Sequence, residues 1–205
     1  MGESRVHGLG GIVESAETFR RIVHMSAIVY LAYYLIPEEL FPGFYKWYGV
    51  IIIMSCVLIF EAIRLKTGKV FFGMRSHEKK RFSAYAWFAM GMGIALLFFK
   101  MQYVIPCVIG MAVIDPLIGE IKRRKKALYP PLPSLFYGLI MLVGLLLLSN
   151  LTLLLILLFT IIGTIFAIFA ENWDIKFIDD DFLMLIIPIL ALSTLDYLLS
   201  TNSII

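Results

Sequence analysis

The apolar run PSLFYGLIMLVGLLLLSNLTLLLILLFTIIGTIFAIFA extends from Pro133 to Ala170 and contains no charged residue. A helix that crosses a membrane needs roughly 20 such residues, so this run is too long for a single crossing. The polar pair Ser149-Asn150 lies near its middle and suits a turn. The run therefore predicts two consecutive transmembrane helices joined by a tight hairpin.

The chain as a whole has the same character, since 60% of its residues are hydrophobic and only 16% are charged. Such values are typical of an integral membrane protein. Further apolar stretches occupy Ile22–Ile36, Trp47–Phe60, Phe82–Phe99, Tyr103–Ile114 and Phe182–Leu199. The prediction is an all-α, polytopic protein with about seven transmembrane helices, although the short stretch ending at Ile114 also suits a re-entrant segment. A polar segment, residues 1–18, precedes one membrane-embedded domain, residues 19–205.

The basic residues predict the orientation of this bundle. Of the 18 lysines and arginines, all except Lys46 and Lys100 fall on the side of the N-terminus if the chain crosses seven times. Short cytoplasmic loops carry an excess of such residues, so the N-terminus is predicted to be cytoplasmic and the C-terminus external. The basic rim would attract anionic lipid headgroups or a nucleotide, whereas nucleic acid is a poor explanation for it.

Acidic residues gather on the same cytoplasmic side. They are Glu61, Asp115, Glu120, Glu171, Asp174, Asp179, Asp180 and Asp181, and the cationic side chains Arg20, Arg21 and His24 join them. Carboxylate oxygens suit Mg²⁺, which uses one or two of them together with phosphate oxygens. A basic run from Lys122 to Lys126 follows and could hold a triphosphate. This pattern is typical of an enzyme that brings a soluble nucleotide to a lipid headgroup.

Each of these features also has a purely structural interpretation. Asp115 could pair with a nearby cation, although carboxylates at membrane depth are usually functional. The basic run could serve orientation alone. The acidic run Asp179–Asp181 could cap the last helix, where the helix dipole favours acids. His24 could be a packing histidine, and Glu61 with Arg64 could form a simple ion pair within one helix.

Five motifs, in this order, resemble the CTP-dependent lipid kinases, a family that includes dolichol kinase, yeast-type diacylglycerol kinase and phytol kinase. The motifs are FRRIVHM, FEAIRL, EKKRFSAYAWFAMG, VIDPLIGEIKRRKK and FAENWDIKFIDDDFLMLIIP, and they cover Phe19 to Pro188. The family is related to phosphatidate cytidylyltransferase-like membrane proteins. The resemblance implies Mg²⁺-dependent transfer of a phosphoryl group from CTP to a lipid alcohol.

The resemblance also implies roles for single residues. Asp115, Glu171, Asp180 and Asp181 would be metal ligands, Gly119 and the basic residues Lys122, Arg123, Arg124, Lys125 and Lys126 would bind CTP, and Asp115, Arg21 and His24 would be catalytic. One segment departs from the family pattern. After the basic run the family usually has a lysine, a threonine or serine, and then a glutamate and glycine, whereas this chain reads PLPSLFYG. Only Ser134 and Gly138 could correspond, so either the phosphate-binding lysine comes from the basic run or that contact is lost.

The expected function is therefore CTP-dependent phosphorylation of a polyprenol- or dolichol-type alcohol at the cytoplasmic membrane face. A second possibility is a cytidylyltransferase that makes a CDP-activated lipid from CTP and a lipid phosphate. A third is an inactive scaffold or a small transporter, although a transporter would carry polar groups near the bilayer midplane. The chain contains no Gly-x-x-x-x-Gly-Lys-Ser/Thr loop of soluble-type ATPases.

Overall fold

The computed structural model describes residues 18–19, 21–71, 74, 76–173, 175 and 177–202. Helical turns from Arg21 continue into the 3₁₀ helix η1 (Ser26–Leu35). The elements that follow are β1 (Glu39–Phe41), β2 (Phe44–Tyr45), α2 (Lys46–Thr67), η2 (Ser76–Lys80), α3 (Ala84–Phe98), α4 (Met101–Arg124), η3 (Lys126–Leu128), α5 (Pro131–Leu148), α6 (Leu153–Glu171) and α7 (Asp180–Asn202). The predicted residues Arg20, Asp174 and Lys176 lie outside the described part.

The structure confirms the predicted helical architecture and the division of the long apolar run, and its long apolar helices are compatible with a membrane protein. Helix α5 ends at Leu148 and α6 begins at Leu153, so the turn lies at the predicted Ser149-Asn150. The described residues contain five helices that are long and apolar enough to cross a membrane, namely α2, α4, α5, α6 and α7. The apolar helices Arg21–Leu35 and Ala84–Phe98 are shorter, so seven crossings remain a prediction.

Two features differ from the sequence prediction. The apolar stretch that ends at Ile114 is part of the 24-residue helix α4, which continues to Arg124. At about 1.5 Å per residue this helix is longer than the roughly 30 Å hydrocarbon layer, so it is long enough to cross a membrane. The second difference is the hairpin of β1 and β2, in which Gly43 adopts a left-handed φ of 81°.

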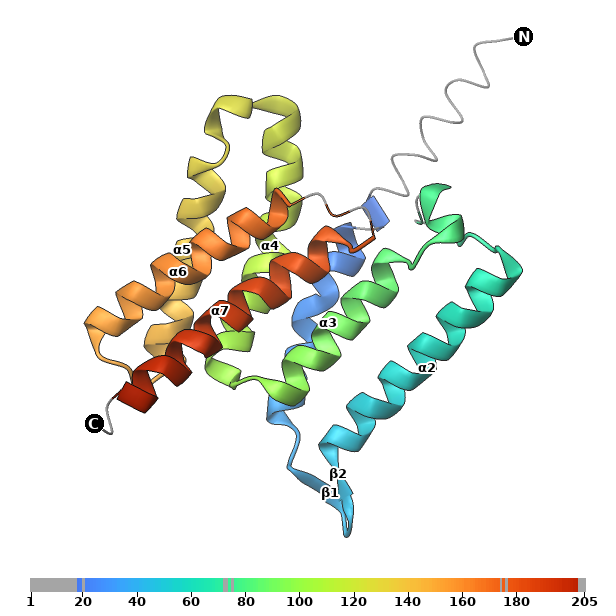
Figure 1. Cartoon of the computed structure of the whole chain (residues 1–205), viewed down its shortest axis with the longest axis horizontal. Coiled ribbons are helices and arrows are strands. Elements are labelled where there is room, and N and C mark those ends of the chain that lie inside the picture. The colour runs from blue at the N-terminus through green and yellow to red at the C-terminus, as the bar shows by residue number, and fades with distance from the viewer. Residues whose placement is uncertain are drawn as a thin grey trace.

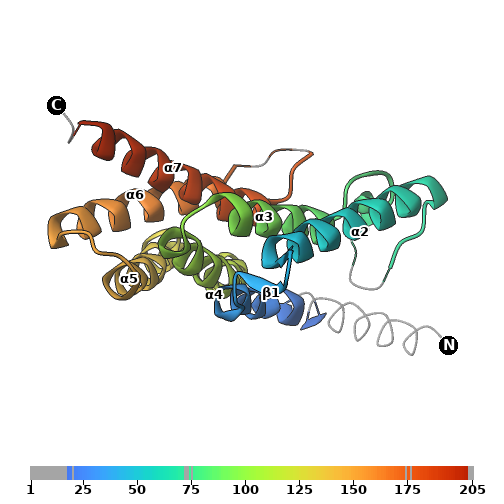
Figure 2. The same cartoon turned by 90° about the horizontal axis from the view of Figure 1, so that it is seen from below.

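Helix α4 lies at the centre of the bundle and is the most buried of the five long helices. It packs against α5, α7 and η1, while α3 packs against both α7 and α2. Seen from below, α7, α3 and α2 lie on one side of the molecule, and α5, α4 and η1 lie on the other (Figure 2). Helix α2 stands at one edge (Figure 1) and is the least buried long helix.

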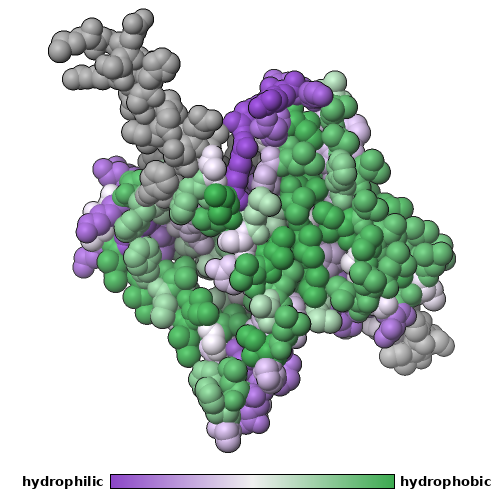
Figure 3. Space-filling view, turned by 180° about the vertical axis from the view of Figure 1, so that it is seen from behind, coloured by the Kyte–Doolittle hydropathy of each residue, from purple (hydrophilic) through white to green (hydrophobic). Residues whose placement is uncertain are grey.

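The connections between helices alternate between two ends of the molecule. The upper end in Figure 1 holds η2, the α4–α5 connection and the α6–α7 connection, and the lower end holds the β-hairpin and the α5–α6 turn. Hydrophilic residues gather at the upper edge and at the lower tip of the molecule, with a broad hydrophobic surface between them (Figure 3). This distribution is the one expected of a bundle that crosses a bilayer.

A buried ion-pair network ties the upper end of α2 to the start of α3. Arg64 donates from Nε and Nη2 to the two carboxylate oxygens of Glu61, at 2.8 and 2.7 Å. It also donates to the carbonyl oxygens of Glu78 and Arg81, at 2.9 and 2.5 Å. The backbone N–H of Ser83 donates to Glu61 at 2.6 Å. The motif FEAIRL therefore contains an ion pair, as one interpretation of the sequence proposed, and this pair also organises a connection.

Glycines bring α5 close to α4. A Cβ atom at Gly110 would lie 2.5 Å from Cε2 of Tyr137, whose ring is fully buried. Small residues at helix interfaces allow such close approach in membrane proteins.

We expect Gly110→Ala to destabilise the protein by about 1–3 kcal/mol, because the buried Tyr137 ring has nowhere to move. Gly49→Ala is the matched control, since no heavy atom lies within 4 Å of a Cβ built there. Thermal unfolding in detergent measures both variants. Equal unfolding temperatures for Gly110→Ala and the wild type would contradict this account of the α4–α5 contact.

Candidate functional site

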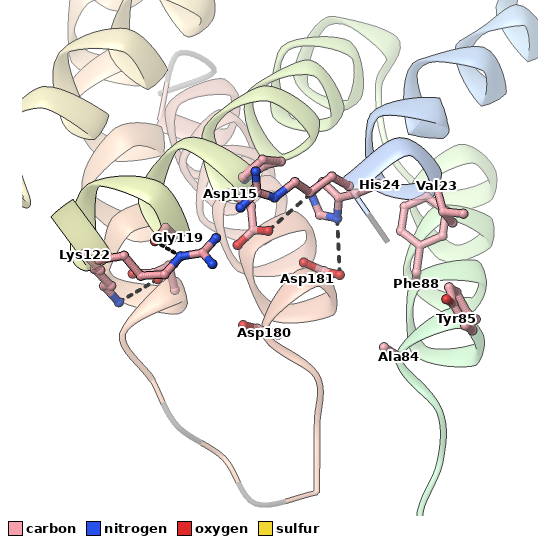
Figure 4. Close-up of a pocket in the computed structure, with 14 residues that line it drawn as sticks. Val23, His24, Ala84, Tyr85, Phe88, Asp115, Gly119, Lys122, Asp180 and Asp181 are labelled. Atoms are coloured by element: carbon pink, nitrogen blue, oxygen red, sulfur yellow. Dashed lines mark hydrogen bonds and ion pairs between the residues drawn. The ribbon is translucent and has the colours of Figure 1, made fainter. Parts of the chain in front are cut away.

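The centre of the candidate site is a cluster of His24, Asp115 and Asp181, which come from three segments distant in sequence. His24 Nδ1 lies 3.3 Å from Asp181 Oδ2, and His24 Nε2 lies 3.7 Å from Asp115 Oδ2. Figure 4 shows the imidazole between the two carboxylates. The side chains are largely buried, with exposed fractions of 9% for His24, 28% for Asp115 and 16% for Asp181. A buried pair of carboxylates needs a cationic or proton-donating partner, and His24 lies where it can provide one.

Helix α4 positions both Asp115 and the ring of His24. Pro116 follows Asp115 inside the helix and lacks the N–H that would bond to the carbonyl four residues earlier. In the preceding turn, the Met111 carbonyl accepts a hydrogen bond from His24 Nε2 at 3.1 Å. The His24 ring therefore contacts α4 close to Pro116, and its hydrogen bond to the Met111 carbonyl fixes the orientation of the imidazole.

The start of α7 positions Asp181. The Asp179 side chain accepts a hydrogen bond from the backbone N–H of Asp181 at 3.2 Å, which is N-terminal capping. The capping role that the sequence suggested for this acidic run thus falls on Asp179, while the Asp181 side chain faces His24. Asp180 and Asp181 occupy the first turn of α7, where the helix dipole favours negative charge.

A polar cavity of about 510 Å³ surrounds this cluster. The predicted site residues that line it are Arg21, His24, Asp115, Gly119, Lys122, Arg123, Glu171, Asp180 and Asp181. Val23, Ala84, Tyr85, Phe88 and Pro116 complete the wall. Cations and carboxylates from the first helical segment, α4, α6 and α7 therefore meet in one space, at the end of the molecule that carries the α6–α7 connection (Figures 1 and 4).

Glu171 lines the cavity and is hydrogen-bonded to two neighbouring side chains. Its Oε1 accepts from Lys122 Nζ at 2.7 Å, and its Oε2 accepts from the Tyr129 hydroxyl at 2.6 Å. Burial and the Glu171 carboxylate both raise the pKa of Tyr129, which keeps this donor protonated. The sequence analysis did not identify Tyr129, because a tyrosine in a loop carries no motif. Glu171 therefore holds the Lys122 ammonium in place, and its predicted role as a metal ligand stays a prediction.

The basic run divides into residues that face the cavity and residues that do not. Lys122 and Arg123 line it, whereas Lys125 and Lys126 are exposed away from it. Arg124 forms an ion pair with Glu120, which also lies 3.4 Å from Arg21 Nη2.

Ser134 does not contribute to this cavity. Its hydroxyl donates to the Pro130 carbonyl at 2.9 Å, within the first turn of α5. The predicted phosphate contacts of Ser134, Arg124, Lys125 and Lys126 therefore lie outside the cavity wall.

The remaining carboxylates fit a magnesium ion. One oxygen each of Asp115 and Asp181 and one ring nitrogen of His24 lie within 4.8 Å of one another, and Asp180 lies beside them in the first turn of α7. Mg²⁺ prefers hard oxygen ligands and usually takes one or two carboxylates, completing its shell with water and phosphate oxygens. Asp115 and Asp181 are two carboxylates of that kind, and Asp180 groups with Asp179 and Asp181 at the start of α7. His24, held by the Met111 carbonyl, serves better to orient the carboxylates than to bind the metal.

Comparison of the chain with known protein families, with curated proteins and with solved structures finds no match.

Proposed function

We propose that this protein transfers the γ-phosphoryl group of CTP to a membrane lipid alcohol of the polyprenol or dolichol type, at the cytoplasmic face of the membrane. The observation that carries the proposal is the convergence of four carboxylates, a histidine and cations that include Lys122 and Arg123 around one cavity. Phosphoryl transfer needs this combination, because catalysis consists mainly of positioning and of charge stabilisation. The preference for CTP rests on the sequence resemblance alone.

The residues of the cavity would have different roles in the transfer. Lys122 and Arg123 would bind the phosphate oxygens, and Glu171 with Tyr129 would hold the Lys122 ammonium in place. Mg²⁺ held by Asp180 and Asp181 would neutralise phosphate charge. Asp115 would accept a hydrogen bond from the lipid hydroxyl and orient it towards the phosphate.

The proposed step exchanges one phosphorus–oxygen bond for another. The hydroxyl oxygen forms a new bond to the γ-phosphorus as the bond from that phosphorus to the β-phosphate oxygen breaks. CDP leaves, and the hydroxyl proton passes to the Asp115 carboxylate. The phosphorylated lipid remains in the membrane because its hydrocarbon chain never leaves it.

The test is to incubate the purified protein with Mg²⁺, γ-labelled CTP and, separately, dolichol, phytol, diacylglycerol and their phosphates. Label recovered in the lipid, with release of CDP, is the expected result and names the acceptor. Label released as pyrophosphate in the presence of a lipid phosphate would replace the proposal with the cytidylyltransferase. Absence of lipid-dependent CTP turnover would indicate a scaffold or transporter.

Asp196 provides an internal control for the location of the site. Its carboxylate lies 2.7 Å from Lys100 Nζ, and Asp196 lies in the C-terminal half of α7, whereas the candidate site is at the start of this helix. We expect Asp196→Asn to keep activity within about twofold, because exposed ion pairs contribute only about 0–1 kcal/mol. A loss as large as that of a site variant, measured in the same assay, would place the reaction at the other end of the bundle.

A further inference from the structure

A second cavity, of about 470 Å³, lies between η1, α2 and α3. We call it the apolar cavity. Its wall includes Tyr30 of η1, Val57, Phe60 and Glu61 of α2, and Ser83 and Phe88 at and within α3. Its volume falls in the range of about 300–1,000 Å³ that is common for small-molecule sites. Most of its wall is aliphatic or aromatic, so it suits a hydrocarbon occupant.

The apolar cavity joins the polar cavity directly. Val23, Tyr85 and Phe88 line both of them. Figure 4 shows these three side chains on the opposite side of His24 from Lys122. A molecule that extended through both cavities would therefore meet cations at one end, carboxylates and an imidazole in the middle, and apolar side chains at the other end.

The apolar cavity is also accessible from the side of the bundle. Tyr30 of η1 is 47% exposed, and in α2 Phe60 is 55% exposed and Cys56 is exposed as well. These residues lie on segments that the sequence predicts to be within the bilayer. A lipid chain could therefore enter between η1 and α2 without crossing the aqueous phase.

The one carboxylate in this wall, that of Glu61, is paired within the protein. Both oxygens of Glu61 accept from Arg64, and one of them also accepts from the Ser83 N–H. A hydrocarbon chain beside them would leave no carboxylate without a partner, so the usual cost of covering a buried charge does not arise.

We propose that the apolar cavity binds the first isoprene or methylene units of the lipid alcohol, so that its hydroxyl reaches Asp115 between Val23 and Phe88. This inference rests on the proposed function. Charge favours a neutral alcohol over a phospholipid as the occupant, because a phosphate headgroup at the same depth would face the carboxylates of Asp115 and Asp181.

Photo-crosslinking in detergent tests this site without requiring turnover. The probe is a long-chain isoprenoid alcohol with a diazirine on its first isoprene unit, and labelled peptides are mapped by mass spectrometry. We expect saturable labelling within residues 56–60 and 83–89, which unlabelled alcohol abolishes. Labelling that a phospholipid of equal chain length abolishes equally well would show a general lipid site and overturn the proposal.

A pair of tryptophan variants provides the control. Val57→Trp places an indole in the cavity. Ile59→Trp introduces the same side chain at a position that is 61% exposed and does not line the cavity. We expect Val57→Trp to lower saturable labelling roughly tenfold and Ile59→Trp to leave it unchanged. Equal labelling of both variants, or labelling that maps only to other helices, would refute the site.

The γ-labelled CTP assay on the same wild-type sample separates this inference from the proposed function. Saturable labelling of the cavity without phosphoryl transfer would retain the lipid site and refute the kinase. Transfer without labelling of the cavity would retain the kinase and refute the lipid site.

Discussion

Replacing Asp115 or Asp181 with asparagine is expected to lower lipid phosphorylation by about 100- to 1,000-fold, the range observed when one preorganised electrostatic group is removed from an active site. Asparagine keeps the shape of the side chain and removes its charge. Each aspartate faces His24, so each substitution also removes one of the two carboxylates that this imidazole bridges. The measurement is the initial rate of label transfer from γ-labelled CTP into the lipid.

The double variant is the sharper experiment. If the two carboxylates act as one unit around His24, combining the substitutions should cost little more than either alone, because such effects are strongly non-additive. Asp196→Asn is the matched control on the same helix as Asp181. Normal turnover by either single variant, in protein that unfolds at the wild-type temperature, would remove that residue from the site.

Replacing Arg64 with methionine is expected to destabilise the protein by about 3–5 kcal/mol, because it leaves a buried carboxylate without its partner. Glu61 would lose the two hydrogen bonds from Arg64, and the carbonyls of Glu78 and Arg81 would lose theirs. Methionine keeps an unbranched stem of similar width and removes the guanidinium. Thermal or denaturant unfolding in detergent measures the change.

Two further variants serve as comparisons for Arg64→Met. Lys66→Met makes the same chemical change at an exposed position of α2 and should stay within about 0.5 kcal/mol of the wild type. The double variant Glu61→Leu/Arg64→Met should be more stable than Arg64→Met alone, since it removes the unpaired charge. If Arg64→Met unfolded like Lys66→Met, the network would not hold the α2–α3 connection together.

Much of the candidate site could be predicted from the positions of its charged residues relative to the apolar runs. Charged residues mark the ends of apolar runs, and alternate crossings bring every second end to the same side. That reasoning led to His24, Asp115 and Asp181, which line one cavity in the structure. That reasoning could not predict that Lys122 lines the cavity and Lys125 does not, because neighbouring residues on a helix face different directions.

The sequence by itself determined the class of protein and the division of its longest apolar run into α5 and α6. Both follow from hydropathy, which is a local property, since a helix in a bilayer must satisfy its own backbone and expose apolar side chains. The end of α4 was harder to predict. Its backbone hydrogen bonds continue past Asp115 to Arg124, because helical bonding does not stop where the side chains become polar.

Only the tertiary structure decided which charged groups meet. It placed His24 between two aspartates, bound both oxygens of Glu171 to Lys122 and Tyr129, and assigned the cap of α7 to Asp179. It also joined the apolar cavity to the polar one through Val23, Tyr85 and Phe88. These contacts depend on how each helix is rotated and packed against its neighbours, and hydropathy along the chain carries no information about that rotation.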